Sequence, residues 1–213
     1  VADMDSTMIE QECIDELADA LGLKPQVAEI TERAMRGELD FEAALDTRVA
    51  LLKGLERKLV EDVRRERITL APGGRALIQT MNAYGAYTAL VSGGFTLFAD
   101  YFAKRIGFDE AVANVLQFDA EDRLTGTVEK PIVDKTTKRN RLMALTAEKG
   151  LSVAQTMAVG DGANDLDMLQ AAGLGVAIHA KPIVAEQASV RIDHSDLTAL
   201  LYLQGYSDDD IVR

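Results

Sequence analysis

Three short polar clusters, each placed directly after an apolar stretch, carry the side chains that could do chemistry. They are Asp3-Met4-Asp5-Ser6-Thr7, Ser92-Gly93-Gly94 and Gly160-Asp161-Gly162-Ala163-Asn164-Asp165. Carboxylates that meet in one crevice cannot all be ionised without a cation between them. Oxygen ligands suit a hard cation such as Mg²⁺, the usual partner of phosphate, and the glycines after Ser92 let main-chain N–H groups approach an anion. The clusters therefore predict a magnesium site that handles phosphate.

The apolar stretches before these clusters are typical of strands in a parallel sheet. We expect strands at residues 1–5, 86–91, 156–159, 174–178 and 190–192, and helices at residues 72–84, 95–106, 134–148 and 163–172. Residues 111–118 and 124–128 form an additional β-excursion. Strands that alternate with helices predict a parallel sheet covered on both faces. Ligands bind such sheets at the carboxyl ends of the strands, so the three clusters should meet there.

A block of helices without strands interrupts this alternation, at residues 14–21, 27–35, 41–52 and 59–65. We therefore expect an α/β fold, with a Rossmann-like parallel sheet core (residues 1–10 and 71–213) and an inserted small helical cap domain (residues 11–70). Arg48 lies seven residues after Phe41, on the same helical face and within an apolar stripe. A guanidinium there must be paired or must bind something, and its planar fork suits a carboxylate. A salt bridge within the cap is the alternative.

Charge and composition limit the class of partner. The chain has 35 acidic and 23 basic residues and a formal net charge of −12, which argues against nucleic-acid binding. Any phosphate site must be made locally positive by a metal or by a few placed cations. The single cysteine, Cys13, and the two distant histidines, His179 and His194, argue against a disulfide or a zinc site and are interpreted as structural.

Location and chain limits follow from the same sequence. No apolar run approaches the roughly 20 residues needed to cross a bilayer, so we expect no membrane association and a cytoplasmic protein. The sequence starts at Val1, two residues before the first acidic cluster, so we expect an upstream segment, and a regulatory domain there is an open question.

The ordered clusters resemble the motifs of the haloacid dehalogenase superfamily of phosphotransferases. The match comprises Asp3, Asp5 and Thr7, then Ser92, then Lys138, then Asp161 and Asp165. The opening Asp-x-Asp-Ser-Thr, the cap residues 41–48, Val-Ser-Gly-Gly-Phe at 91–95 and the cluster at 160–165 are similar to the phosphoserine phosphatases of that superfamily. The resemblance extends over essentially the whole chain, cap included.

The resemblance implies a role for each matching residue. Asp3 would be the nucleophile, and Asp5 would protonate the leaving oxygen and then deprotonate water. Mg²⁺ would be held by the Asp3 side chain, the Asp5 main-chain carbonyl and Asp161. The residues that would hold the phosphoryl group or orient the metal ligands are Ser92, Gly93, Lys138, Asn164 and Asp165. Lys135 is the rival of Lys138, which fits the family spacing better, and Lys181 is interpreted as a surface lysine.

The resemblance also implies the substrate, O-phosphoserine, and so the last step of serine biosynthesis. Glu12 would meet the substrate ammonium, Arg48 its carboxylate, and Phe41 would line the same site. For Glu12, a solvated carboxylate at a helix start is the alternative. Two other functions stay open: a related enzyme that uses another small phosphate ester or an alcohol acceptor, and a phosphoaspartate receiver domain in signalling. A receiver would lack both Asp5 and the cap. We expect a monomer or a homodimer.

Overall fold

The structure, a computed structural model, describes residues 1–35 and 38–212. Its helices are α1 Cys13–Ala20, α2 Lys24–Met35, α3 Phe41–Ala50, α4 Arg57–Glu66, α5 Gly74–Ala83, α6 Thr96–Ile106, α7 Lys135–Glu148, α8 Leu166–Ala171, α9 Pro182–Gln187 and α10 Ala199–Leu203. Its strands are β1 Ala89–Phe95, β2 Glu110–Asn114, β3 Leu116–Phe118, β4 Leu124–Val128, β5 Met157–Gly160, β6 Leu174–Ile178 and β7 Val190–Ile192. None of the described helices is long and apolar enough to span a membrane.

The core is a parallel sheet assembled around the first residues of the chain. β1 pairs with β2, and β6 pairs with both β5 and β7, all in parallel. Ala2 forms parallel bridges to Leu90 of β1 and to Val159 of β5. The order is therefore β2, β1, the segment around Ala2, β5, β6 and β7. The predicted α/β fold with a Rossmann-like parallel sheet is confirmed.

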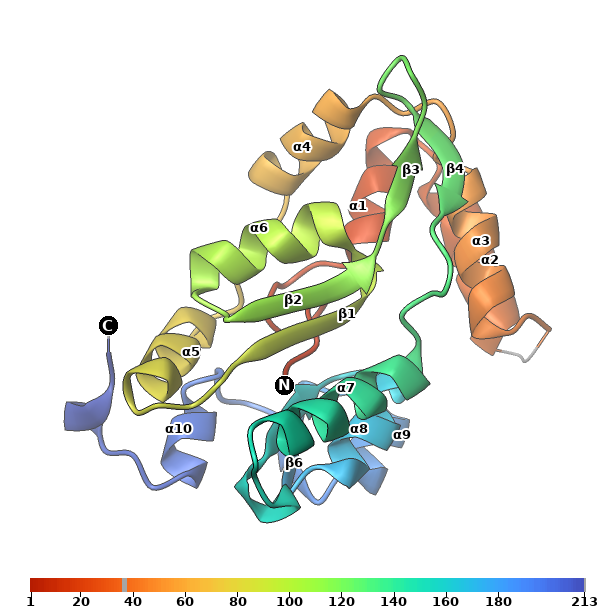
Figure 1. The fold of residues 1–213 in the computed structure, drawn as a ribbon. Helices are drawn as coiled ribbons and strands as arrows, with labels where there is room; N and C mark the ends of the chain where they lie inside the picture. The colour runs from red at the N-terminus through yellow and green to blue at the C-terminus, as the bar shows by residue number, and fades with distance from the viewer. Residues whose placement is uncertain (36–37, 213) are drawn as a thin grey trace.

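Both faces of this sheet are buried, which explains why its strands are continuous apolar runs. Leu90 and Val176 belong to the apolar core that α5, α6 and α10 also supply. The intervening strand residues face the other side, where Val91 packs near α7 and Ala177 packs against α8 and α9. Figure 1 shows α6 on one side of β1 and β2, with α7 and α8 on the other.

The structure divides residues 111–118, which were predicted to form one arm of a β-excursion. Glu110–Asn114 is an edge strand of the core sheet, whereas Leu116–Phe118 pairs antiparallel with β4. Asn114, the last residue of β2, is held in the core sheet by two hydrogen bonds. Its Nδ2 donates to the Gly93 carbonyl at 2.8 Å, and its Oδ1 accepts from the Val133 N–H at 2.7 Å. A pattern of apolar residues does not reveal hydrogen bonds between distant segments. The prediction of one continuous β-segment at residues 111–118 was therefore wrong.

Two short helices, α9 and α10, were not predicted. They contain 6 and 5 residues, which is less than two full turns and too short for a recognisable apolar period. The strand predicted at residues 1–5 is reduced to isolated bridges at Ala2, because the chain turns away from the sheet by Asp5. The other predicted strands and helices are present, with ends that differ by a few residues.

Helices α1–α4 form a block that leaves and rejoins the core at one place (Figure 1). Ile9 bridges Leu70 in antiparallel fashion, and the Ala71 N–H donates to the Met8 carbonyl at 3.0 Å. The limits 11–70 predicted for a cap domain stay a prediction, and α1–α4 lie within them.

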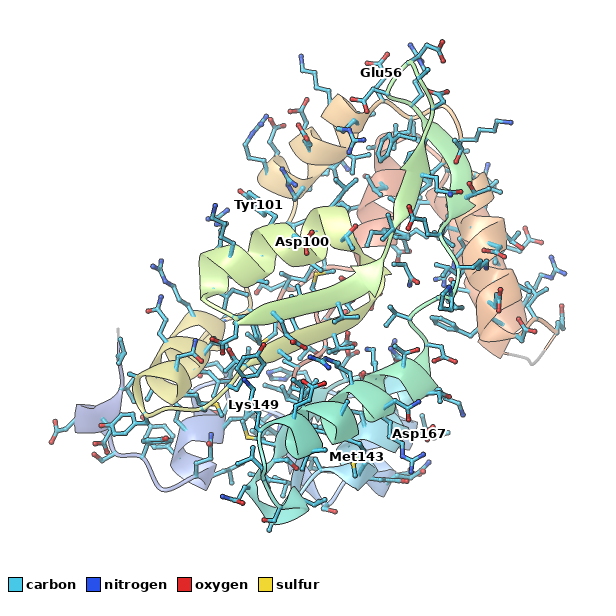
Figure 2. All side chains as sticks on the ribbon, in the orientation of Figure 1. Glu56, Asp100, Tyr101, Met143, Lys149 and Asp167 are labelled. Carbon is cyan, nitrogen blue, oxygen red and sulfur yellow. The ribbon has the colours of Figure 1, made fainter. Side chains whose placement is uncertain are left out.

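The β3–β4 hairpin packs with this helical block although it comes much later in the sequence. The Gly54 N–H donates to the Leu124 carbonyl at 2.7 Å, and the Leu124 N–H donates to the Leu55 carbonyl at 2.8 Å. Beyond them Arg123 forms a 2.9 Å ion pair with Glu56, which Figure 2 labels beside the hairpin turn. The hairpin and α1–α4 therefore form one structural unit above the sheet.

Candidate active site

The centre of the sheet places the first and third clusters side by side. The Asp3 N–H donates to the Val159 carbonyl at 3.0 Å, so Asp3 emerges where the chain leaves the sheet beside β5. Asp161 directly follows the last residue of β5. On the other side of Asp3, Ser92 and the glycines after it lie within β1, whose pairing register shifts between Val91 and Phe95. The expected turn after Ser92 is thus an irregular strand end, in which Ser92 Oγ accepts from the Gly94 N–H at 2.9 Å.

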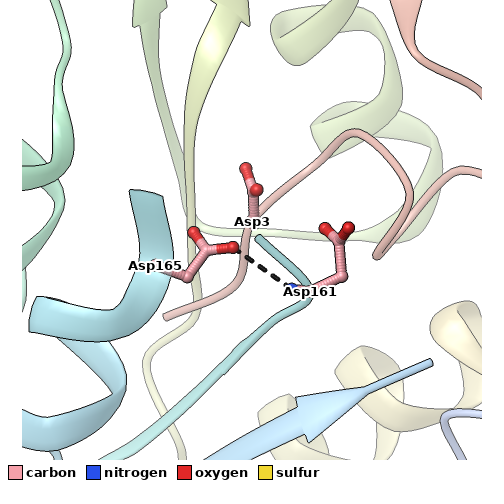
Figure 3. A group of neighbouring side chains, drawn as sticks. All are labelled: Asp3, Asp161 and Asp165. Atoms are coloured by element: carbon pink, nitrogen blue, oxygen red, sulfur yellow. Dashed lines mark hydrogen bonds between the residues drawn. The ribbon is translucent and has the colours of Figure 1, made fainter. Parts of the chain in front are cut away.

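Three buried carboxylates meet at this point. Asp3, Asp161 and Asp165 each offer an oxygen, and these oxygens lie within 4.8 Å of one another (Figure 3). Asp165 is folded back toward the strand end, because its Oδ2 accepts from the main-chain N–H groups of Asp161 (3.1 Å) and Gly162 (3.0 Å). A Cβ at Gly160 would lie 2.4 Å from Asp165 Cγ, so only glycine there leaves room for this carboxylate.

Lys138 joins the carboxylates from α7. Its Nζ lies 2.7 Å from Asp3 Oδ1 and 2.7 Å from Asp165 Oδ1, and its side chain is fully buried. Burial alone would lower the pKa of Lys138, but the Asp3 and Asp165 carboxylates outweigh it and raise that pKa, so the ammonium stays charged. Lys135, its rival from the sequence, is exposed, and its Nζ lies 3.9 Å from Asp167.

The two oxygens of Asp3 are not equivalent. Oδ1 accepts from the Met4 N–H at 2.7 Å and contacts the Lys138 ammonium, whereas no hydrogen bond joins Oδ2 to a described residue. Burial raises the pKa of Asp3, Asp165 adds to the effect, and Lys138 opposes it. Burial and Asp165 likewise raise the pKa of Asp161 to about 6. The positive charge of one lysine does not balance the negative charge of three carboxylates. A divalent cation that prefers oxygen ligands therefore fits the cluster.

Asp5 lies in a different environment within the same cavity. Burial and the Glu12 carboxylate raise the pKa of Asp5 to about 7, and the Cys13 N–H, which donates to its Oδ2 at 3.1 Å, opposes the shift. The other oxygen, Oδ1, is buried and has no hydrogen-bond partner among the described residues. A carboxyl group that titrates near neutral pH can both give and accept a proton.

A cavity of about 390 Å³ opens over these groups, between the sheet and the helical block. Most of the remaining predicted residues line it: Glu12, Phe41, Arg48, Ser92, Gly93 and Asn164. Lys138 is not in the lining and reaches the site from behind Asp3.

The cap residues that line the cavity carry both charge and apolar surface. Glu12 Oε1 accepts from Ser6 Oγ at 2.9 Å. Arg48 Nε donates to the Ala44 carbonyl at 3.2 Å, and Arg48 makes no ion pair within 4.0 Å of any described carboxylate. Burial lowers the pKa of Arg48, and the nearby Asp15 and Glu12 carboxylates oppose the effect. Phe41 Cζ would lie 3.3 Å from a Cβ at Gly93, so the helical block meets β1 there.

Sequence reasoning missed part of this lining. Lys181 is exposed, as expected for a surface lysine, yet it also lines the cavity beside Asp161. Its position shortly after an apolar strand was the available signal. The mainly apolar wall was also missed. Thr31 lies among its apolar residues, which come from the helical block and the end of β1: Ile14, Ala34, Leu39, Ala44, Leu45 and Phe95.

Known proteins are similar to this chain in both sequence and fold. Residues 1–170 match the family model for haloacid dehalogenase-like hydrolases. A phosphoserine phosphatase from Streptomyces coelicolor is 47% identical over 99% of the chain, and one from Haemophilus influenzae is 49% identical over 98%. The chain spans only 51% and 66% of the lengths of these two relatives.

A solved structure, described as a phospho-aspartyl intermediate analogue of phosphoserine phosphatase, superposes with a TM-score of 0.87. It is 39% identical, and the alignment covers 95% of this chain and 96% of the other. The match to the family model over most of the sequence and the shared fold lead to one conclusion: the chain belongs to the haloacid dehalogenase-like hydrolase family.

Proposed function

We propose that the chain hydrolyses O-phosphoserine to serine and phosphate through an aspartyl-phosphate on Asp3. The observation that carries the proposal is the asymmetry of Asp3, with Oδ1 held by Lys138 and Oδ2 free of hydrogen bonds from described residues. The relatives named phosphoserine phosphatases support the same substrate. In a cell this reaction would be the last step of serine biosynthesis.

The metal we propose is Mg²⁺. Asp3 and Asp161 supply oxygen ligands close enough to share one ion, and no sulfur or imidazole group belongs to the cluster, so the donors fit a hard cation. The main-chain carbonyl of Asp5 is the third proposed ligand, and Asp165 and Asn164 orient this group. When bound, the ion would offset the negative charge that gathers around the phosphoryl group.

The chemical steps follow from the positions of two carboxyl groups. Asp3 Oδ2 attacks phosphorus, the bond from phosphorus to the serine oxygen breaks, and that oxygen takes the proton of the Asp5 carboxyl group. Asp5, now a carboxylate, accepts a proton from water as the water oxygen attacks the phosphorus on Asp3. The bond from phosphorus to Asp3 Oδ2 breaks, which releases phosphate and restores the Asp3 carboxylate. A pKa near 7 suits Asp5 to both duties. Ser92, the Gly93 N–H and Lys138 hold the phosphoryl oxygens meanwhile.

Substrate recognition is assigned to the cap, proposed as residues 11–70 above a core of residues 1–10 and 71–213. Arg48 would bind the substrate carboxylate and Glu12 its ammonium, with Phe41 packed over Gly93 beside them. Arg48 has no ion pair within 4.0 Å among the described residues, which leaves its terminal nitrogens available for a ligand. Membership of a hydrolase family also supports an enzyme over the alternative of a signalling receiver.

The decisive experiment measures phosphate release from a panel of phosphate esters with Mg²⁺, with and without a small alcohol. We expect phosphoserine to have the highest kcat/KM and water to be the preferred acceptor. A higher kcat/KM for an ester without an amino-acid group would refute the substrate. Formation of a new phosphate ester with the alcohol at the expense of free phosphate would refute the acceptor.

A further inference from the structure

The cavity contains a cation that the steps above do not use. Lys181 lies after β6 and lines the cavity, and its main-chain N–H donates to the Asp161 carbonyl at 3.1 Å. Its Nζ has no ion pair within 4.0 Å in the part of the chain that the structure describes, and the side chain is exposed to solvent.

The charge of the cavity makes this lysine unusual. Four carboxylates line it (Asp3, Asp5, Glu12 and Asp161), whereas the cationic side chains among its described lining residues are Arg48 and Lys181. Lys138 already contacts two carboxylates at 2.7 Å and lies behind Asp3. The whole chain carries a net charge of −12. A phosphate dianion that approaches this cavity from solvent is therefore repelled by the lining carboxylates and attracted, among the described lining side chains, by Arg48 and Lys181.

We propose that Lys181 is a substrate-binding residue that attracts the phosphate group into the cavity and pairs with one of its outer oxygens. The proposal rests on the phosphatase function proposed above. Arg48 is assigned to a carboxylate, so among the described lining residues Lys181 is the solvent-exposed cation left for the phosphate. Because Asp3, Asp5 and Lys138 remain in place without it, its side chain should govern capture of the anion rather than the rate of the chemical steps.

The test replaces the Lys181 side chain while keeping its main-chain N–H, and with it the hydrogen bond to Asp161. Lys181→Met removes the charge and keeps most of the length, and Lys181→Arg restores a cation. Lys104→Met is the matched control, because Lys104 is an exposed lysine of α6 outside the cavity and its loss changes the net charge equally. Each protein is assayed with phosphoserine and with p-nitrophenyl phosphate, at low and high ionic strength. Inorganic phosphate binding in Mg²⁺ is measured by calorimetry.

We expect Lys181→Met to lower kcat/KM by roughly tenfold at low salt, mainly through KM, for both substrates. The Kd of inorganic phosphate should rise by a similar factor. The differences in kcat/KM and Kd between Lys181→Met and the unmodified protein should shrink at high salt, and Lys181→Arg should recover most of the lost kcat/KM. Lys104→Met should match the unmodified protein.

Several outcomes would overturn the role of Lys181. They are an unchanged phosphate Kd in Lys181→Met, a loss confined to kcat, an equal loss in Lys104→Met, or no phosphate binding by any of the proteins. A chain that hydrolyses p-nitrophenyl phosphate but not phosphoserine would refute the proposed substrate alone. In that case the phosphate Kd and the p-nitrophenyl phosphate kinetics would still decide the role of Lys181.

Discussion

Replacing Arg48 with alanine tests whether the cavity binds a substrate carboxylate. The guanidinium is partly buried, and the one hydrogen bond it makes within the described chain runs from Nε to the Ala44 carbonyl. Its two terminal nitrogens are therefore available to a ligand, in the planar arrangement that suits a carboxylate. Glu12, in the same cavity, has the charge that an ammonium group requires.

The expected magnitude follows from this geometry. Truncating one partner of a buried, hydrogen-bonded charge pair costs about 2–5 kcal/mol. At about 1.4 kcal/mol per factor of ten, this is a loss of roughly thirty- to several-thousand-fold in kcat/KM for phosphoserine. Arg48→Lys keeps the charge but lacks the planar pair of N–H donors, so it should recover only part of the lost kcat/KM for phosphoserine.

The assay compares three substrates. Phosphoserine has a carboxylate, phosphoethanolamine keeps the ammonium without it, and p-nitrophenyl phosphate has neither group. Arg48→Ala should impair the first strongly and the other two little, and phosphoethanolamine should already be a poor substrate of the unmodified enzyme. Arg65→Ala is the control, because Arg65 is an exposed cap arginine that pairs with Asp62 and Glu66. Unfolding in urea, measured in parallel, separates lost recognition from lost stability.

Equal losses of kcat/KM on all three substrates would refute the reasoning. Arg48 would then support the cap without touching a ligand, and the choice of phosphoserine would depend on similarity to relatives alone. Unchanged phosphoserine kinetics would refute it as well.

Four further outcomes are expected. Asp3→Asn should abolish phosphate release while its circular dichroism and urea midpoint stay near those of the unmodified protein; substantial turnover would contradict the mechanism. Removal of metal with EDTA should abolish activity, Mg²⁺ should restore it, and Ca²⁺ should inhibit, because a larger ion can occupy both oxygens of Asp3; activity that survives exhaustive chelation would disprove the requirement. Lys138→Met should lower the free energy of unfolding by about 3–5 kcal/mol, since Asp3 and Asp165 lose their buried partner; urea denaturation measures this, and an unchanged midpoint would count against it. The pKa of Asp5 is raised to about 7, so between about pH 4 and pH 7 the folded state holds a proton that the unfolded chain has released. The stability of the metal-free protein should therefore fall as the pH rises through this window, and Asp5→Asn should flatten that part of the curve; identical curves would rule out the shift.

The convergence of the polar clusters was predictable from sequence. Asp3 and Asp161 follow apolar stretches of one parallel sheet, whose carboxyl ends must share an edge. The choice of Lys138 over Lys135 rested on the spacing of the family motifs. The helical period does not make that choice, because both lysines lie on the face of α7 that carries the buried Leu142.

Other features depend on contacts between distant segments and could not be predicted. Asn114 divides β2 from β3 by hydrogen bonds to Gly93 and Val133, neither of which is near it in sequence. Among the described residues, Oδ2 of Asp3 and Oδ1 of Asp5 have no hydrogen-bond partner, and this is a property of the packed cavity. Lys181 resembles any polar residue after a strand until the position of the cavity is known.

The pairing of Ile9 with Leu70 has a consequence for how new selectivities can arise in this architecture. The two ends of the intervening segment lie on neighbouring backbone, about 5 Å apart, so another segment that closes the same gap would leave the sheet undisturbed. The helical block between them can therefore be exchanged as a cassette while the buried carboxylates of Asp3, Asp161 and Asp165 stay in place. The hydrogen bonds of Leu124 to Gly54 and Leu55 set the limit of that cassette. A transplanted helical block must bring its own β3–β4 hairpin to keep these hydrogen bonds.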